Sequence, residues 1–161
     1  MSSDQFQLKE AMRRWASGVT VVTVNDQGID HGMTVSSFTS VSLEPPLITV
    51  SLMKQTRSLS MIMNSNTFGI TILSDQQKEI SKVFAGQVED TQNRFTGIQT
   101  KRLVTGSPMI EGGLAFLDCR VFDVLRFGTN SLIIGEVIVA EISEHVKPLL
   151  YFNQRYQQLQ D

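Results

Sequence analysis

Residues 31–58 read HGMTVSSFTSVSLEPPLITVSLMKQTRS, and the fold is interpreted outward from this stretch. Small hydroxyl residues come first, then Pro45-Pro46, then the apolar run Leu47 to Leu52, and finally the polar cluster 54–58. A buried strand between two donor-rich segments can bring hydroxyls and backbone amides to opposite sides of one ligand that is aromatic at one end and anionic at the other. Serine and threonine also fill edge strands and turns. From these residues alone, both interpretations stay open.

The composition is that of an ordinary globular protein. Of 161 residues, 41% are hydrophobic, and the formal net charge is -2. This length is most simply one domain covering residues 1–161, and nothing in the charge pattern predicts nucleic acid as a partner. The apolar stretches are shorter than the roughly 20 residues that cross a bilayer. Because the N-terminus lacks an apolar signal core, we expect a cytoplasmic protein without a membrane association.

The residues give little sign of metal or nucleophilic chemistry. The single cysteine, Cys119, lies in an alternating apolar run, which favours a small buried strand residue over a nucleophile. His31 and His145 show neither HxH nor HxxxH spacing, so no metal site is expected. The motifs GxGxxG, GxxxxGK[ST] and GxSxG are absent from the sequence.

The remaining periodicity predicts many strands and few helices. Leu8, Ala11, Met12 and Trp15 predict one apolar face on a first helix that ends near Ser17, with Trp15 as a core anchor. Strands are predicted at Val19–Val24, Leu47–Leu52, Thr67–Leu73, Leu114–Leu125 and Ser131–Ile142, with a turn at Asn25–Gly28 and a break in pairing at the two prolines before Leu47. A helix is predicted at Arg57–Asn64. A further helix is predicted after the capping box of Ser74 and Gln77, with Ile80, Val83 and Phe84 buried.

Two later features complete the expected fold. Gly135, in the middle of the last predicted strand, indicates a bulge or a close approach of another chain segment. Tyr151, Phe152 and Tyr156 in the tail are expected to pack on the sheet or on a partner. Together these patterns predict a mainly β protein with some α-helix, a small antiparallel barrel capped by helices.

The order of motifs along the chain resembles the short-chain flavin reductases, the reductase components of two-component flavin-dependent monooxygenases. The resemblance rests on GVTVVT, HGMTVSSFTSVSLEPPLITVSL, DQQKEISKVFAG, NRF, GSPMIEGGLAFLDCRV, GTNSLIIGEV and PLLYF, which cover nearly the whole chain. It implies an FMN-binding split β-barrel, antiparallel and Greek-key-like, in a homodimer. It also implies an enzyme that uses NADH or NADPH to reduce FMN or FAD and releases the reduced flavin to a separate oxygenase.

The resemblance also implies the site. No catalytic residue is expected, since hydride passes directly from nicotinamide to flavin. The residues implied to bind flavin lie in three segments of the chain. They are Met33, Thr34, Val35, Ser36, Ser37, Thr39 and Ser40, then Ser51, Leu52, Met53, Lys54, Gln55, Thr56, Arg57 and Ser58, then Lys82, Phe84 and Ala85.

The chain departs from the family at one position. Many relatives carry an Asp-His pair, with the His associated with the nicotinamide nucleotide, where this sequence has Thr129-Asn130. Asn130 can form hydrogen bonds but carries no charge and cannot stack as imidazole does. His31 is a candidate for the nicotinamide or flavin edge, or a surface residue of a hairpin. Tyr151 and Arg155 are candidates for the dinucleotide pocket, or for packing and dimer contacts.

Three functions are compatible with these residues. The first is an NAD(P)H:flavin oxidoreductase that supplies reduced flavin to a partner monooxygenase. The second is a flavin-retaining electron carrier or sensor of the same fold, which the Thr129-Asn130 departure favours. The third is a barrel without flavin that acts as a binding module. The small Ser and Thr contacts suit a flavin that must dissociate, and therefore favour the first.

Overall fold

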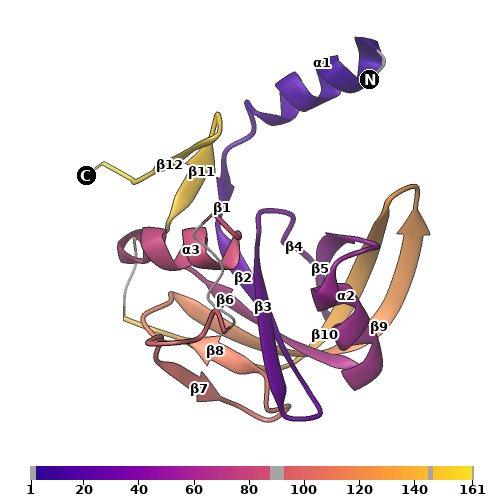
Figure 1. Ribbon diagram of the computed structural model, residues 1–161, viewed down its shortest axis with the longest axis vertical. Helices are drawn as coiled ribbons and strands as arrows, with labels where there is room; N and C mark the ends of the chain where they lie inside the picture. Colours follow the sequence, from indigo (N-terminus) through magenta and orange to yellow (C-terminus); the bar gives the residue numbers. More distant parts are fainter. Residues whose placement is uncertain (1–2, 88–92, 145–146, 161) are drawn as a thin grey trace.

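The computed structural model describes residues 3–87, 93–144 and 147–160 (Figure 1). The helices of this part are α1 (Ser3–Met12), α2 (Arg57–Ser65) and α3 (Lys78–Phe84), the last preceded by the 3-10 turn η1 (Asp75–Gln77). The strands are β1 (Ser17–Gly18), β2 (Thr20–Asp26), β3 (Ile29–Val35), β4 (Thr39–Leu43), β5 (Pro46–Met53), β6 (Thr67–Ile72), β7 (Thr100–Arg102), β8 (Pro108–Ile110), β9 (Ala115–Phe127), β10 (Asn130–Ile142), β11 (Leu150–Phe152) and β12 (Arg155–Gln157).

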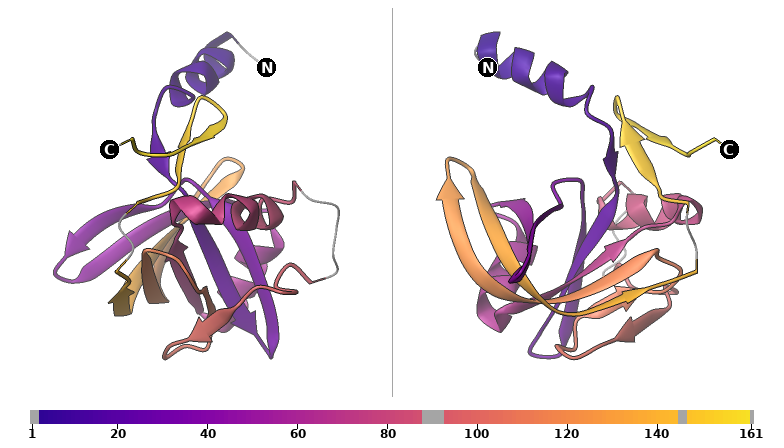
Figure 2. Two further views of the ribbon diagram at one scale, coloured as in Figure 1. Left: turned by 90° about the vertical axis from the view of Figure 1, so that its left-hand side faces the viewer. Right: turned by 180° about the vertical axis from the view of Figure 1, so that it is seen from behind.

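One antiparallel sheet of seven strands forms the body of the protein. Its order is β3-β2-β6-β9-β10-β5-β4, so the two edges are β3 and β4, which residues 36–38 connect. The long β9–β10 hairpin curves away from the body, and α2 lies inside that curve (Figures 1 and 2). The polar loop of residues 36–38 therefore lies at the opening between the two edges of the sheet.

The core lies on both faces of β2. Val22 and Val24 pack under α2 in one cluster, while Val21 joins Phe84 of α3 in a second cluster. Residues 20–24 are all buried because the strand is covered on both sides, as its β-branched sequence favours. The sheet thus fixes α2 and α3 on either side of the strand that leads into residues 31–58.

Several predicted local features are confirmed. Asn25–Gly28 forms the turn between β2 and β3, with Gln27 and Gly28 both at positive φ, as a tight hairpin turn requires. The pairing of β10 with β9 shifts at Ile134/Gly135. A side chain at Gly135 would lie 2.4 Å from the Phe68 ring, so the glycine allows a close approach of the core aromatic.

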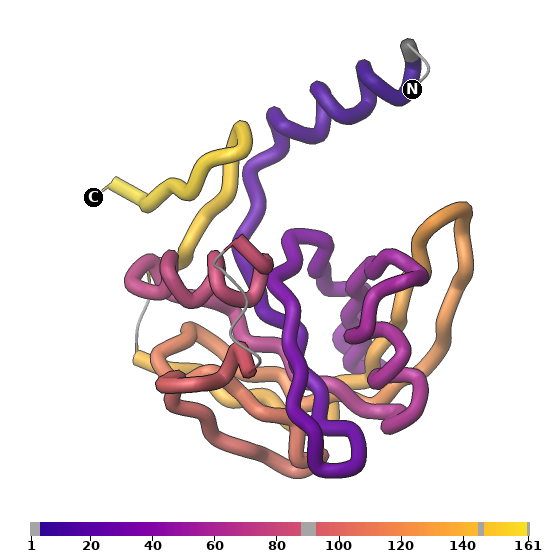
Figure 3. Tube along the Cα trace, in the orientation of Figure 1, coloured from indigo at the N-terminus to yellow at the C-terminus, as the bar shows by residue number. Residues whose placement is uncertain are grey.

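The first helix and the two prolines differ from expectation. Helix α1 ends at Met12, short of the predicted Ser17, and it stands clear of the sheet (Figure 3). The prediction that Trp15 anchors the core was wrong, since 68% of its surface is exposed. The predicted break in pairing at Pro45-Pro46 was also wrong. Leu43 pairs with Pro46, which begins β5, and Glu44 and Pro45 form the turn of the β4–β5 hairpin.

For three side chains of the other two helices, the predicted burial also differs from the burial in the structure. The apolar positions of residues 57–64 predict Met63 on the buried side of α2, but Met61 is buried there and Met63 is 40% exposed. In α3, Phe84 is fully buried, whereas Ile80 and Val83 are only partly buried. The helix turns its Ser81 inward as well, and this position becomes part of the candidate site.

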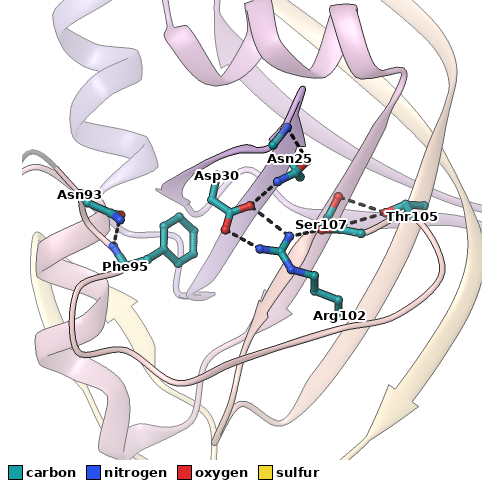
Figure 4. Close-up of polar contacts among 9 residues, drawn as sticks. Asn25, Asp30, Asn93, Phe95, Arg102, Thr105 and Ser107 are labelled. Carbon is teal, nitrogen blue, oxygen red and sulfur yellow. Dashed lines mark hydrogen bonds and ion pairs between the residues drawn. The ribbon is translucent and has the colours of Figure 1, made fainter.

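The short β7–β8 hairpin is fastened to the tip of the β2–β3 hairpin by an ion pair that the sequence did not predict. The guanidinium of Arg102 donates to both carboxylate oxygens of Asp30, at 3.0 and 2.6 Å, and Asn25 donates to the same carboxylate at 2.6 Å (Figure 4). This contact joins residues 72 positions apart. It stabilises the end of the sheet opposite the polar loop.

Candidate functional site

The loop at the opening of the sheet is held by one serine side chain. The Ser37 hydroxyl donates to the carbonyl oxygen of Ser51 at 2.9 Å and accepts from the backbone N–H of Ser51 at 3.0 Å. The paired residues of β4 reach only as far as Thr49 on β5, so the Ser37 hydroxyl bonds to the edge of β5 just beyond the end of β4. The first donor-rich segment of the sequence therefore contacts the strand that separates it from the second.

The Thr129-Asn130 pair joins the same place from the β9–β10 turn. The Asn130 side-chain amide donates to the Ser51 hydroxyl at 3.2 Å, and the Thr129 hydroxyl donates to the Asn130 side-chain oxygen at 3.0 Å. The Lys54 backbone N–H donates to the carbonyl oxygen of Thr129 at 2.9 Å. Asn130 is thus brought together with the predicted flavin-binding strand β5.

The N-terminus of α2 carries an unusual buried group. Thr56 caps the helix by accepting from the Leu59 N–H at 3.4 Å. Ser58, in the first turn, is 1% exposed, and its hydroxyl has no hydrogen-bond partner among the residues that the structure describes. A helix N-terminus offers backbone N–H groups and a partial positive charge. Together with the exposed Arg57, these groups suit a phosphate.

His31 lies on β3 and is partly buried. Burial, and then the charges of Arg57 and Arg94, lower the pKa of His31 to about 4. The imidazole is therefore neutral near pH 7, where it can donate or accept a hydrogen bond but carries no charge. Arg94, which sequence reasoning did not single out, donates to the carbonyl oxygens of Gly32 at 3.2 Å and Phe84 at 3.1 Å.

A small cavity of about 170 Å³ opens between β3 and α3. The predicted flavin residues Thr34, Ser36 and Ala85 line it together with the predicted nicotinamide residue Tyr151. The Thr34 hydroxyl donates to the Ser81 carbonyl oxygen at 2.7 Å, which ties β3 to α3. Tyr151 packs edge-on against the Tyr156 ring, with ring centres 5.4 Å apart. The structure therefore brings these four residues together.

A second hollow, of about 400 Å³, adjoins the first. It shares Ser36 and Tyr151 with the small cavity, and Ser37 and Trp15, which follows α1, also line it. Sequence reasoning assigned Trp15 to the core and so missed its place here. The sequence held no signal for this position, because the apolar periodicity of residues 8–15 predicts burial.

The other predicted flavin residues are scattered around this opening. Met33 and Leu52 pack in the core cluster below it, with Leu52 fully buried, and Val35 is buried as well. Phe84 is also a core residue, whose ring packs edge-on against Phe95 at 4.9 Å, so it can offer only backbone atoms to a ligand. The exposed or partly exposed residues that remain are Thr39, Ser40, Met53, Gln55 and Lys82.

Two of the charged candidates have different surroundings. Lys82 makes an exposed ion pair with Glu79 at 2.7 Å and so remains available at the surface of α3. Arg155, on β12, is exposed and pairs with Phe152 in the tail hairpin. Among the described residues, no hydrogen bond or ion pair connects Arg155 with the residues around Ser51. Its role in the dinucleotide pocket therefore stays a prediction.

Two negative findings apply to the described residues. The described ranges contain no group of three or more His, Cys, Asp or Glu side chains that could hold a metal ion. Within the same ranges, no helix has the length and apolar character that crossing a membrane requires. His145 lies outside the described residues.

Comparison with known proteins identifies the class. Residues 12–160 match the sequence profile of the flavin reductase like domain, and the chain therefore belongs to this family. The reductase component of an FADH2-dependent resorcinol hydroxylase from a Rhizobium species is 35% identical over 150 residues, which cover 92% of this chain and 83% of the relative. The resemblance that the sequence motifs indicated is confirmed.

Solved structures agree with the fold. A flavin reductase in its native state is 38% identical with a TM-score of 0.89, and 100% of each chain is covered. An NADH:FAD oxidoreductase of Streptomyces globisporus, in complex with NAD and FAD fragments, is 29% identical with a TM-score of 0.89, covering 98% of this chain and 93% of the other. The predicted class, a mainly β split barrel with capping helices and oxidoreductase activity, is confirmed.

Proposed function

We propose that this chain is an NAD(P)H:flavin oxidoreductase that reduces FMN or FAD and supplies the reduced flavin to a partner monooxygenase. Family membership supports the reaction. The Rhizobium relative, named as the reductase component of a hydroxylase, supports the separate partner. The Streptomyces globisporus oxidoreductase, in complex with NAD and FAD fragments, supports the two nucleotides.

The observation that carries the proposal is the unpaired Ser58 hydroxyl at the start of α2. A buried hydroxyl without a partner costs about 1–3 kcal/mol, so it calls for a partner from outside the chain, such as a water, an ion or a ligand. The α2 N-terminus and the exposed cation Arg57 beside it favour an anionic oxygen. The residues present thus fit the phosphate end of a flavin nucleotide.

The chain's own residues bind and orient the reactants. A bound flavin supplies the ring that accepts the hydride of the nicotinamide. The Ser51 hydroxyl, fixed by Asn130, and the open rim at Ser36 and Ser37 provide hydrogen bonds for the ring and its side chain. His31, whose pKa is lowered to about 4, stays neutral and does not act as a general acid near pH 7. No acid or nucleophile of the chain is needed.

The test is anaerobic mixing of the purified protein with excess FMN or FAD, followed by NADH or NADPH. We expect the oxidised-flavin absorbance of many equivalents to disappear for each protein molecule. Bleaching of a single bound equivalent would contradict the reductase and support the flavin-retaining carrier, which the Thr129-Asn130 departure favours. Failure to bind flavin at all would contradict both and support the binding module.

We further propose a homodimer. Helix α1 exposes Phe6, Leu8 and Met12, and the exposed Trp15 follows it. An apolar surface of this kind on an isolated helix supports a contact with a second copy. Sedimentation at micromolar protein should give a dimer, and an 18.0 kDa species alone would contradict it. A cytoplasmic location stays a prediction that cell fractionation can test.

A further inference from the structure

Asn130 occupies the position at which many resembling flavin reductases carry a histidine associated with nicotinamide. In this chain its hydrogen bonds lead to β5. The amide nitrogen donates to the Ser51 hydroxyl at 3.2 Å, and the amide oxygen accepts from the Thr129 hydroxyl at 3.0 Å. In the structure the amide nitrogen of Asn130 therefore faces Ser51, and its amide oxygen faces Thr129.

The backbone of Ser51 is equally constrained. Its N–H and carbonyl groups both bond to the Ser37 hydroxyl, while on the other side β5 pairs with β10 and places Ser51 opposite Leu132. The side chain of Ser51 is only partly buried, at the opening of the sheet. Its hydroxyl therefore has a fixed position that a ligand can reach.

The direction of the Asn130 bond determines what Ser51 can offer. A hydroxyl has one proton to donate and two lone pairs with which to accept. Since the hydroxyl accepts from Asn130, its own proton is left for another acceptor, and none is found for it among the described residues. The oxidised flavin presents carbonyl and ring-nitrogen acceptors that could take it.

We propose that Asn130 is a positioning residue for flavin binding: its amide holds the Ser51 hydroxyl as a donor toward an acceptor on the flavin. The inference rests on the proposed function, since it needs a flavin beside Ser51. It differs from a nicotinamide contact because Asn130 acts through Ser51 on the flavin. The asparagine that stands where many relatives carry a histidine would then serve to position a flavin-binding group.

The sharpest variant is Asn130→Asp, which keeps the shape of the side chain and turns the donor into an acceptor. The new carboxylate accepts the Ser51 proton, so the hydroxyl no longer donates to flavin. We expect the dissociation constant of oxidised FMN or FAD, measured by flavin fluorescence without turnover, to rise about tenfold, as loss of one hydrogen bond predicts. The Michaelis constant for NADH should stay within about twofold.

Two further variants separate positioning from charge. Gln99→Glu makes the same change from amide to carboxylate at an exposed residue near β7, and should leave flavin affinity unchanged. Ser51→Ala removes the hydroxyl and should weaken flavin binding about as much as Asn130→Asp. In the double variant the two losses should not add, because Asn130 acts through Ser51. Circular dichroism of each variant checks that it folds.

The outcomes distinguish the inference from the proposed function. Flavin affinity unchanged in Asn130→Asp, with a raised Michaelis constant for NADH, would identify a nicotinamide contact and overturn the inference alone. Fully additive losses in the double variant would also overturn it, because Asn130 would then act without Ser51. If the wild-type protein fails to bind either flavin, the proposed function falls, and the inference with it.

Discussion

The hydroxyl of Thr34, on β3, donates a hydrogen bond of 2.7 Å to the backbone carbonyl oxygen of Ser81, in α3. The Ser81 hydroxyl in turn lies 2.9 Å from the Tyr156 hydroxyl. One chain of polar contacts therefore connects a predicted flavin strand, the helix that carries Lys82, and the C-terminal hairpin. All three elements contribute lining residues to the small cavity beside Ser36.

We expect Thr34→Val to lower the free energy of unfolding by about 1 kcal/mol, because valine preserves the shape but loses the hydrogen bond. Flavin affinity should fall too, as the cavity wall loosens. Thr34→Ser retains the hydroxyl and is the matched control. Urea denaturation gives the stability and fluorescence titration gives the affinity. Equal stability of the valine and serine variants would show that the bond contributes nothing.

Ser58→Ala separates stability from function. Removing a buried hydroxyl that lacks a partner should leave the free energy of unfolding unchanged or raise it by up to about 1 kcal/mol. The same change should weaken flavin binding, because a phosphate would lose a donor. Ser65→Ala, whose hydroxyl is bonded to Thr67, should instead destabilise the protein without affecting flavin. Unaltered flavin affinity in Ser58→Ala would remove Ser58 from the site.

Lys82→Ala tests the contact predicted at the end of α3. The ion pair with Glu79 is exposed and contributes at most about 0.5 kcal/mol, so the fold should persist. A charge-assisted contact with phosphate contributes roughly 1.5–3 kcal/mol. The flavin dissociation constant should therefore rise about tenfold or more. Lys78→Ala, in the same helix, is the control. Equal effects of both variants would point to general charge attraction.

His31 should make the protein less stable in mild acid. Its pKa is about 4 in the folded chain, chiefly because of burial, and about 6.5 when unfolded. Between these values only the unfolded chain binds the proton, so the free energy of unfolding falls as the pH drops through this range. His31→Gln should flatten that fall. Denaturation near pH 7 and near pH 5 measures it, and parallel curves for both proteins would contradict the prediction.

The sequence predicted the elements whose patterns are local. The β-branched run at 19–24, the turn at Asn25–Gly28 and the capping box of Ser74 and Gln77 each depend on neighbouring residues, and each is present. The bulge at Gly135 was equally visible, since a strand glycine marks a close approach. The family resemblance, more than periodicity, assembled these elements into a split barrel.

Contacts between distant residues were beyond such reasoning. The apolar positions of α1 predict a buried face, but whether a face is covered depends on where the chain leads the helix, and Trp15 remains exposed. Likewise, the bond between Asn130 and Ser51 depends on the register of β10 with β5, which no local pattern fixes. The predicted site residues were gathered by resemblance, and their individual roles remain predictions.

Cys119 is fully buried, and burial raises the pKa of its thiol to about 12, with Asp118 adding to the effect. Reduced flavin that meets oxygen forms peroxide, and peroxide attacks thiolates that solvent can reach. Because Cys119 is buried, peroxide in the solvent does not reach the single thiol of the chain. Oxidation to methionine sulfoxide should begin at the exposed side chains of Met12, Met53 and Met63. Oxidation during turnover would then modify methionines at the protein surface before it affected the core.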